Sequence, residues 1–245
     1  MRILAADTTT SVNTVAICTS TRVLAETVVD CGRAHSERLL ETVDWVLGEA
    51  GIALQDVDAL AISNGPGSFT GLRVGVAAWK GLALGADLDL VPVPTLDAMT
   101  RLFPFHEGLL CPLLDARMEE VFGAVYRFER GQRTKLTPDR VCPVEELLSA
   151  AGDRVTVFGD GAVRYADRIR RAVPEARFGP LPGAMPRAST VAAEAFELLS
   201  VGGSWGASLV APVYLRKSQA EEAREKRTPV PNGSAGGAAD PERAP

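Results

Sequence analysis

Histidine is scarce in this sequence of 245 residues, which contains only His35 and His106. Neither lies in an HExxH motif or in another cluster with metal-ligand spacing, so a histidine-based metal site or catalytic triad is disfavoured. The four cysteines are widely spaced and form no CxxC pair, which argues against a zinc site and a disulfide framework. The sequence therefore predicts no bound metal and is typical of a chain from a reducing compartment.

Long apolar runs and an excess of positive charge are missing as well. The most apolar window, residues 74–86, is interrupted by Lys80 and is too short to cross a bilayer. The N-terminal apolar run is short and reaches Asp7 without a cleavage site, which argues against a signal peptide. A formal net charge of −5 and a pI near 5.2 provide no basic field for nucleic acid. We expect a cytoplasmic protein that contacts no membrane and binds no RNA by itself.

Three motifs of nucleotide and acyl chemistry do not occur. A GxGxxG fingerprint fails because Thr70 stands at its last position after Gly65 and Gly67, and Gly71 comes one residue late. No Walker phosphate loop and no GxSxG nucleophile elbow is found.

What the sequence does contain is a 46 % apolar composition, enough for a substantial core, arranged in two halves of similar order. The first half predicts strands and helices at 2–7, 13–19, 22–29 (strands), 35–50 (helix), 57–63 (strand), 68–85 (helix), 88–94 (strand) and 95–103 (helix). The second half predicts strands at 109–115, 120–129, 135–143 and 154–160, and helices at 144–152, 162–173 and 189–200. This order predicts an α/β fold built from duplicated subdomains, 1–105 and 106–218, followed by a disordered tail at 219–245.

Two stretches could hold a phosphate. Asp7 and the three threonines after it, Thr8, Thr9 and Thr10, follow the first strand, where they could bind a metal-phosphate group or only cap a turn; we favour the turn. The segment 64–73, NGPGSFTGLR, is either a phosphate loop or a strand-to-helix connection with Ser68 as N-cap.

Four segments, in this order and spacing, resemble the TsaB (YeaZ) family of the actin-like (ASKHA) superfamily: residues 3–17, 35–47, 65–85 and 113–126. The resemblance implies an actin-like fold of βββαβα subdomains with mixed sheets flanked by helices. It implies a non-catalytic partner of the transferase TsaD, acting with the ATPase TsaE to form threonylcarbamoyladenosine beside the anticodon of tRNAs that read codons beginning with adenine. No catalytic residue, cofactor or metal is implied for this chain, and tRNA is met only through the complex.

The resemblance also marks where a nucleotide site has eroded. TsaD has an HxxxH metal pair where this sequence has Thr95 and Met99, and the glycine that many actin-like ATPases carry beside the first aspartate is absent. Gly159 and Gly161 stand where relatives place an adenosine-contacting pair, although they could only form a strand-to-helix turn. The residues of this vestigial nucleotide site are Asp7, Thr8, Thr9, Thr10, Gly65, Gly67, Ser68, Gly159 and Gly161.

The two long predicted helices carry the partner hypothesis. Trp45 lies with polar residues on the face of the first helix opposite its apolar arc, and the second helix is apolar nearly all round. In the TsaB family these two helices pack against TsaD or against a second copy, so a homodimer is expected when the chain is alone. The candidate partner residues are Arg38, Thr42, Trp45, Glu49, Gly71, Leu72, Gly75, Val76, Ala78 and Trp79.

Two alternatives remain open. The sheet and the first helix could cover the second helix completely, which would leave it no partner surface. The chain could also be an ATP-dependent actin-like phosphotransferase that acts alone with Asp7 near the metal; a metallopeptidase is a weaker rival.

Overall fold

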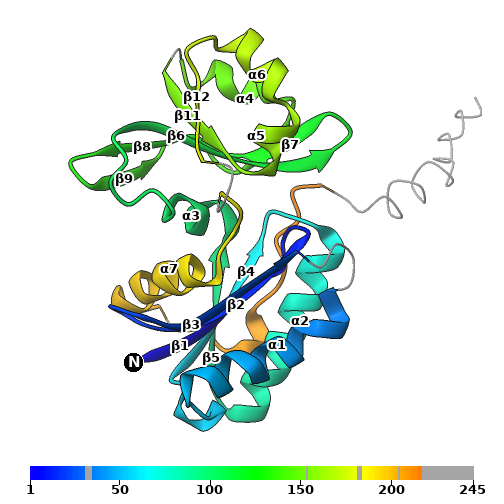
Figure 1. Cartoon of the computed structure of the whole chain (residues 1–245), viewed down its shortest axis with the longest axis vertical. Coiled ribbons are helices and arrows are strands. Elements are labelled where there is room, and N and C mark those ends of the chain that lie inside the picture. The colour runs from blue at the N-terminus through cyan, green and yellow to red at the C-terminus, as the bar shows by residue number, and fades with distance from the viewer. Residues whose placement is uncertain (31–34, 153, 181–183, 204, 217–245) are drawn as a thin grey trace, which may run out of the picture. The chain divides into compact units, whose positions relative to one another are not determined.

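The computed structural model describes residues 1–30, 35–152, 154–180, 184–203 and 205–216 (Figure 1). Residues 1–215 form one compact unit. The predicted disordered tail at 219–245 lies outside the described residues, so its disorder stays a prediction. Among the described residues, no helix has the length and apolar character needed to cross a membrane.

The first sheet has the strand order β3-β2-β1-β4-β5. Its strands are β1 (Arg2–Asp7), β2 (Val12–Thr19), β3 (Val23–Asp30), β4 (Ala59–Gly65) and β5 (Asp89–Pro94). The first three pair antiparallel, whereas β4 and β5 run parallel to β1. The predicted three-strand meander followed by alternating units is confirmed.

The second sheet repeats this order as β10-β7-β6-β11-β12, with a β8–β9 hairpin added beside β6. Its strands are β6 (Gly108–Arg117), β7 (Glu120–Gly123), β8 (Tyr126–Glu129), β9 (Gln132–Lys135), β10 (Arg140–Cys142), β11 (Val155–Phe158) and β12 (Arg177–Phe178). In the first sheet β1 is central, with β2 and β3 on one side and β4 and β5 on the other. In the second sheet β6 is central, with β7 and β10 on one side and β11 and β12 on the other. This equivalence confirms two mixed sheets in a duplicated α/β fold.

Two predicted strands of the second half are wrong as single strands. The strand expected at 120–129 is divided into β7 and β8, although both pair with β6 in one continuous register, from Leu113↔Gly123 to Leu110↔Tyr126. The break lies opposite Pro112, which has no N–H to donate to the ladder. The strand expected at 135–143 is likewise the end of β9 and the whole of β10, separated by a turn that contains Pro138.

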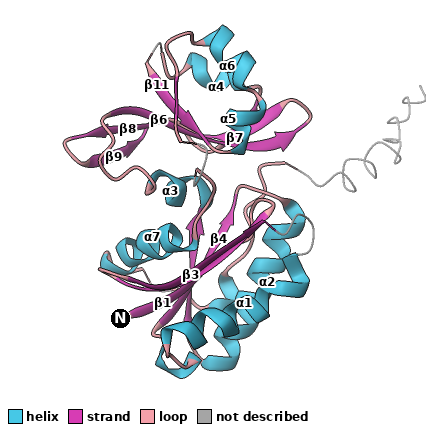
Figure 2. Cartoon of the chain, viewed as in Figure 1, coloured by secondary structure: helices cyan, strands magenta, loops and turns pink. Residues whose placement is uncertain are grey.

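Helices cover both faces of the first sheet (Figure 2). The helices are α1 (His35–Ala50), α2 (Phe69–Ala86), α3 (Thr95–Thr100), α4 (Val144–Ser149), α5 (Asp160–Arg164), α6 (Ala166–Ala172) and α7 (Ala188–Ser200), with short 3₁₀ turns at Leu54–Asp56 and Ala207–Leu209. The α1 and α2 helices bury one face of the sheet, around Leu4, Ile62 and Trp79. The α7 helix buries the other face against Ile3 and Val91. The predicted helix at 162–173 is two helices, because Tyr165 leaves the helical conformation.

The packing of α7 does not follow the predicted division of the chain into two subdomains, 1–105 and 106–218. That division grouped α7 with the second half, yet α7 packs on β1, β2 and β5 of the first sheet. Ala207 and Val210 also join the core beneath α1 and α2. The chain therefore returns to the first sheet after completing the second, an exchange that strand order alone does not indicate.

Candidate functional site

The hairpin that begins at Asp7 is a closed turn. The backbone N–H of Thr9 and its hydroxyl both donate to Asp7 Oδ1, at 2.9 and 2.8 Å. The Thr10 hydroxyl accepts from the N–H of Val12 at 3.1 Å, and Asp7 and the three threonines are all buried. This geometry agrees with the turn interpretation of Asp7, in which the carboxylate satisfies the hairpin's own donors.

The segment 64–73 connects β4 to α2. Ser68 is the N-cap of α2, as predicted, and its hydroxyl accepts from the N–H of Gly71 at 3.3 Å. The N–H of Ser68 donates to the carbonyl of Thr9 at 2.7 Å, which ties this loop directly to the hairpin. The two candidate phosphate-binding stretches therefore contact each other.

The glycines of this loop are needed for close packing within the chain. A Cβ on Gly67 would lie 2.5 Å from the Thr9 Cβ, and one on Gly71 would lie 1.9 Å from the Thr8 carbonyl oxygen. On Gly75 it would lie 2.3 Å from the Thr8 hydroxyl, which itself donates to the Gly71 carbonyl at 2.7 Å. The hairpin thus occupies the space against the loop and the first two turns of α2.

A second segment, residues 205–215, closes the other side of the loop and is called the strap below. The N–H of Val213 donates to the Asn64 carbonyl at 2.7 Å, and a Cβ on Gly65 would lie 2.4 Å from the Val213 carbonyl oxygen. Lys80 Nζ donates to the carbonyls of Ser208 and Val210, both at 3.0 Å. The loop is therefore enclosed by its own chain on two sides.

The glycine pair at 159 and 161 also has a structural reason. Gly159 has a φ of +100°, and a Cβ there would lie 2.2 Å from the Leu113 carbonyl oxygen. A Cβ on Gly161 would lie 3.0 Å from the same strand. These glycines let α5 approach β6, in agreement with the strand-to-helix alternative.

Of the partner residues predicted on α2, most are buried within the chain. Leu72, Val76 and Trp79 are at most 3 % exposed, and Gly71 and Gly75 face the hairpin. Ala78 is half-buried and packs at the edge of the core beneath α1 and α2. The prediction that Val76 contacts a partner is therefore wrong, because its side chain lies in the core, where a charge would destabilise the fold.

The outward side of α2 carries a different set of small residues. Ala77, Gly81 and Gly85 recur every four residues and are exposed, so they form one ridge. A Cβ on Gly81 or Gly85 would meet no atom within 4 Å, and the same is true of Gly48 on α1. Glycine inside a helix is destabilising by about 1 kcal/mol relative to alanine. No described contact within the chain explains why glycine stands at these three positions.

Trp45 lies on a different side of the helix pair. It is 53 % exposed and, with Arg38 and Thr42, borders an open hollow of about 330 Å³. The remaining lining residues are Thr27, Val29 and Glu41, so the hollow lies between α1 and the edge strand β3. Glu49 is exposed on α1 as predicted. The predicted partner residues are therefore not gathered on one surface.

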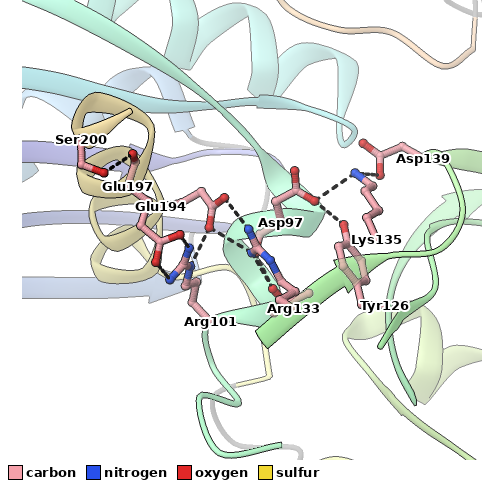
Figure 3. Close-up of polar contacts among 10 residues, drawn as sticks. Asp97, Arg101, Tyr126, Arg133, Lys135, Asp139, Glu194, Glu197 and Ser200 are labelled. Atoms are coloured by element: carbon pink, nitrogen blue, oxygen red, sulfur yellow. Dashed lines mark hydrogen bonds and ion pairs between the residues drawn. The ribbon is translucent and has the colours of Figure 1, made fainter. Parts of the chain in front are cut away.

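A buried ion-pair network, which sequence reasoning missed, joins α3, β9 and α7 (Figure 3). Glu194 on α7 is 5 % exposed and accepts from Arg101 Nε at 2.6 Å and from Arg133 Nη2 at 2.7 Å. Arg133 also donates to the Asp97 carbonyl at 2.8 Å. These contacts hold the β8–β9 hairpin of the second sheet against α3, which follows β5, and against α7, which covers the first sheet.

The same network continues around the Asp97 carboxylate. It accepts from Tyr126 at 2.5 Å and from Lys135 Nζ at 2.9 Å (Figure 3). Burial, together with the adjacent Asp97, raises the pKa of Tyr126, so the phenol remains a donor. The partners lie as far as 96 residues apart along the chain, as in the hydrogen bond from Arg101 to Glu197, and no local pattern connects them. Within the described ranges no group of three or more His, Cys, Asp or Glu side chains has the geometry to hold a metal ion.

Comparison with known proteins gives the family of this chain. The protein TsaB of Escherichia coli, named for tRNA threonylcarbamoyladenosine biosynthesis, is 34 % identical over 227 residues, which cover 90 % of this chain and 96 % of that protein. The chain belongs to the TsaB family. The TsaB protein of Haemophilus influenzae is 32 % identical over 195 residues, which cover 75 % of this chain and 80 % of that protein. A family model described as tRNA N6-adenosine threonylcarbamoyltransferase, TsaD, matches residues 29–161.

Solved structures agree with the TsaB assignment. YeaZ from Pseudomonas aeruginosa matches with a TM-score of 0.74 and 28 % identity, covering 87 % of this chain and 99 % of that one. The ethanolamine utilization protein EutJ from Carboxydothermus hydrogenoformans, at 12 % identity and a TM-score of 0.51, shares the fold alone. The predicted actin-like class and the resemblance to TsaB are both confirmed.

Proposed function

We propose that this TsaB-family chain is a non-catalytic partner of a TsaD-type transferase, acting with a TsaE-type ATPase in threonylcarbamoyladenosine formation on tRNA. The observation that carries the proposal is the closure of the phosphate loop. The space beside the Cα atoms of Gly67 and Gly71, where a side chain would stand, is occupied by Thr9 and Thr8 of the same chain. This packing holds the loop and the start of α2 against the hairpin, so that side of the two glycines is not open to a nucleotide.

The partner surface in this proposal is the outward side of α1 and α2. Its centre is the small-residue ridge of Ala77, Gly81 and Gly85, and we include the exposed Gly48 of α1 in it. Small residues let a second helix approach closely, which offsets the intrinsic instability of glycine in a helix. Trp45 and its hollow lie at the β3 side of α1, and we place them at the periphery of the same contact. A second copy of the chain would use this surface when the transferase is absent.

The test is a tagged purification from the native cell at moderate salt, followed by mass spectrometry of stoichiometric co-eluting proteins. The proposal predicts recovery of the TsaD and TsaE relatives, with tRNA only when TsaD is present. A Trp45→Ala variant should reduce recovery, and Gly81→Leu should abolish it. An Arg154→Gln variant, at a well exposed position just before β11, is the matched control and should change nothing.

The rival function, an ATP-dependent phosphotransferase acting alone, makes the opposite prediction. Calorimetric titration of the purified chain with magnesium and ATP would give micromolar binding, and purification would recover the chain without partners. Under the partner proposal the titration gives no binding in the micromolar range. Asp7, already bonded to its own hairpin, is then a structural residue.

A further inference from the structure

A stacked arginine lies at the start of α2, on the side that faces the strap. The Arg73 guanidinium carbon lies 3.8 Å from the centroid of the Phe69 ring and 5.8 Å from that of Tyr214. Arg73 Nε donates to the Tyr214 hydroxyl at 3.1 Å, and the two ring centroids are 4.7 Å apart. Two aromatic contacts and one hydrogen bond therefore fix the plane of an exposed guanidinium.

The same chain contains a comparable arginine whose ligand is present. Arg168 lies 5.5 Å from the Tyr165 ring centroid and binds both carboxylate oxygens of Glu145, through Nε and Nη2 at 2.6 Å each. Arg101, Arg133 and Arg187 also pair with glutamates. Among the side chains that the structure describes, Arg73 forms no ion pair, and its Nη atoms form no hydrogen bond. Arg73 is thus oriented like Arg168 without a carboxylate to bind.

Tyr214 is itself held in place, which makes the arrangement rigid before any ligand arrives. Its neighbour Val213 donates to the Asn64 carbonyl at 2.7 Å, and further back the strap receives the two bonds from Lys80. A side chain that is already ordered loses little conformational entropy on binding. The Nη groups of Arg73 are therefore already oriented to donate hydrogen bonds to a ligand.

We propose that Arg73, stacked on Phe69 and Tyr214, is a specificity-determining residue that binds an aspartate or glutamate of the protein that packs on α2. This inference rests on the proposed partner function and names the chemistry of that contact. A planar fork of N–H donors matches a carboxylate or a phosphate. The formal net charge of −5 disfavours approach of a polyanionic nucleic acid, so a carboxylate of a protein partner is the ligand.

The experiment measures the affinity of the full chain for the purified TsaD relative of the same organism, from about 50 to 500 mM salt. Arg73→Gln should weaken binding by at least about 30-fold at low salt, the effect of truncating one partner of a desolvated charge pair. It should also flatten the salt dependence, which a merely structural role would leave unchanged. Arg73→Lys keeps the charge but not the fork and should recover only part of the affinity. Arg154→Gln is the control, and thermal unfolding verifies that each variant is folded.

The outcomes separate this inference from the function on which it rests. If Gly81→Leu abolishes binding while folded Arg73→Gln keeps the wild-type affinity and salt slope, the partner function stands and the Arg73 inference is overturned. If neither variant affects binding to TsaD, the proposed α2 surface is wrong as well. If the isolated wild-type chain binds tRNA and Arg73→Gln loses that binding, the ligand is a phosphate and the carboxylate inference fails.

Discussion

Replacing Gly81 with alanine should change stability and partner binding in opposite directions. Position 81 is exposed in the middle of α2, and an added Cβ would meet no atom within 4 Å. The substitution should therefore stabilise the free chain by the difference in helix propensity, about 1 kcal/mol. For a domain of this size that free energy corresponds to a rise in Tm of about 2–4 °C. Thermal unfolding at low protein concentration measures this effect on the free chain.

Binding to the TsaD relative should become weaker in the same variant. A methyl group added to a closely packed contact typically destabilises it by about 1–3 kcal/mol, which corresponds to a loss of affinity of roughly 5- to 150-fold. Calorimetry or biosensor titration with the purified transferase measures the change. Unchanged affinity in a stabilised variant would show that no partner helix approaches the ridge. A fall in Tm would instead contradict the open space at Gly81.

Three further predictions concern the fold that presents this surface. Gly71→Ala should lower the free energy of unfolding by about 1–3 kcal/mol, since its Cβ would lie 1.9 Å from a carbonyl oxygen, and denaturant titration checks it. Glu194→Gln should cost about 3 kcal/mol in the same assay, because Arg101 and Arg133 lose their shared carboxylate; no change would contradict its structural role. The hydrogen bond from Arg101 lowers the pKa of Glu197 in the folded chain. The pair therefore stabilises the fold fully above the unfolded-state pKa of about 4.3, and this contribution is lost as the pH falls through the lower pKa of the folded state. In the Glu197→Gln variant the free energy of unfolding should therefore fall less steeply as the pH is lowered, which denaturant titration at several acidic pH values checks.

The comparison of sequence and structure shows which features are local. The meander, α1, α2 and the N-cap at Ser68 follow from short-range periodicity and capping chemistry, and they are confirmed. The division of the strand at 120–129 depends on Pro112 in the neighbouring strand, so the segment's own composition could not reveal it. Long-range packing is also invisible in the pattern, as the return of α7 to the first sheet illustrates.

The glycines of α2 show most clearly which part of the candidate site the sequence could not predict. Gly71, Gly75, Gly81 and Gly85 look alike in sequence, and the predicted partner residues include only the first two. The structure divides them, because the hairpin at Thr8 fills the space beside the first two while the last two face open space. Likewise, the aromatic partner of Arg73 on the strap lies 141 residues away in sequence, so the stacked arginine could not be predicted from the helix alone.

Whether this chain acts through a TsaD-type partner can be measured in one reconstitution. The transfer of the threonylcarbamoyl group from its adenylate to tRNA would be measured with the TsaD relative of the same organism, with and without this chain. If the chain is such a partner, omitting it, or supplying it as the Gly81→Leu variant, stops or strongly slows product formation. Full activity of the transferase without the chain would contradict the partner role.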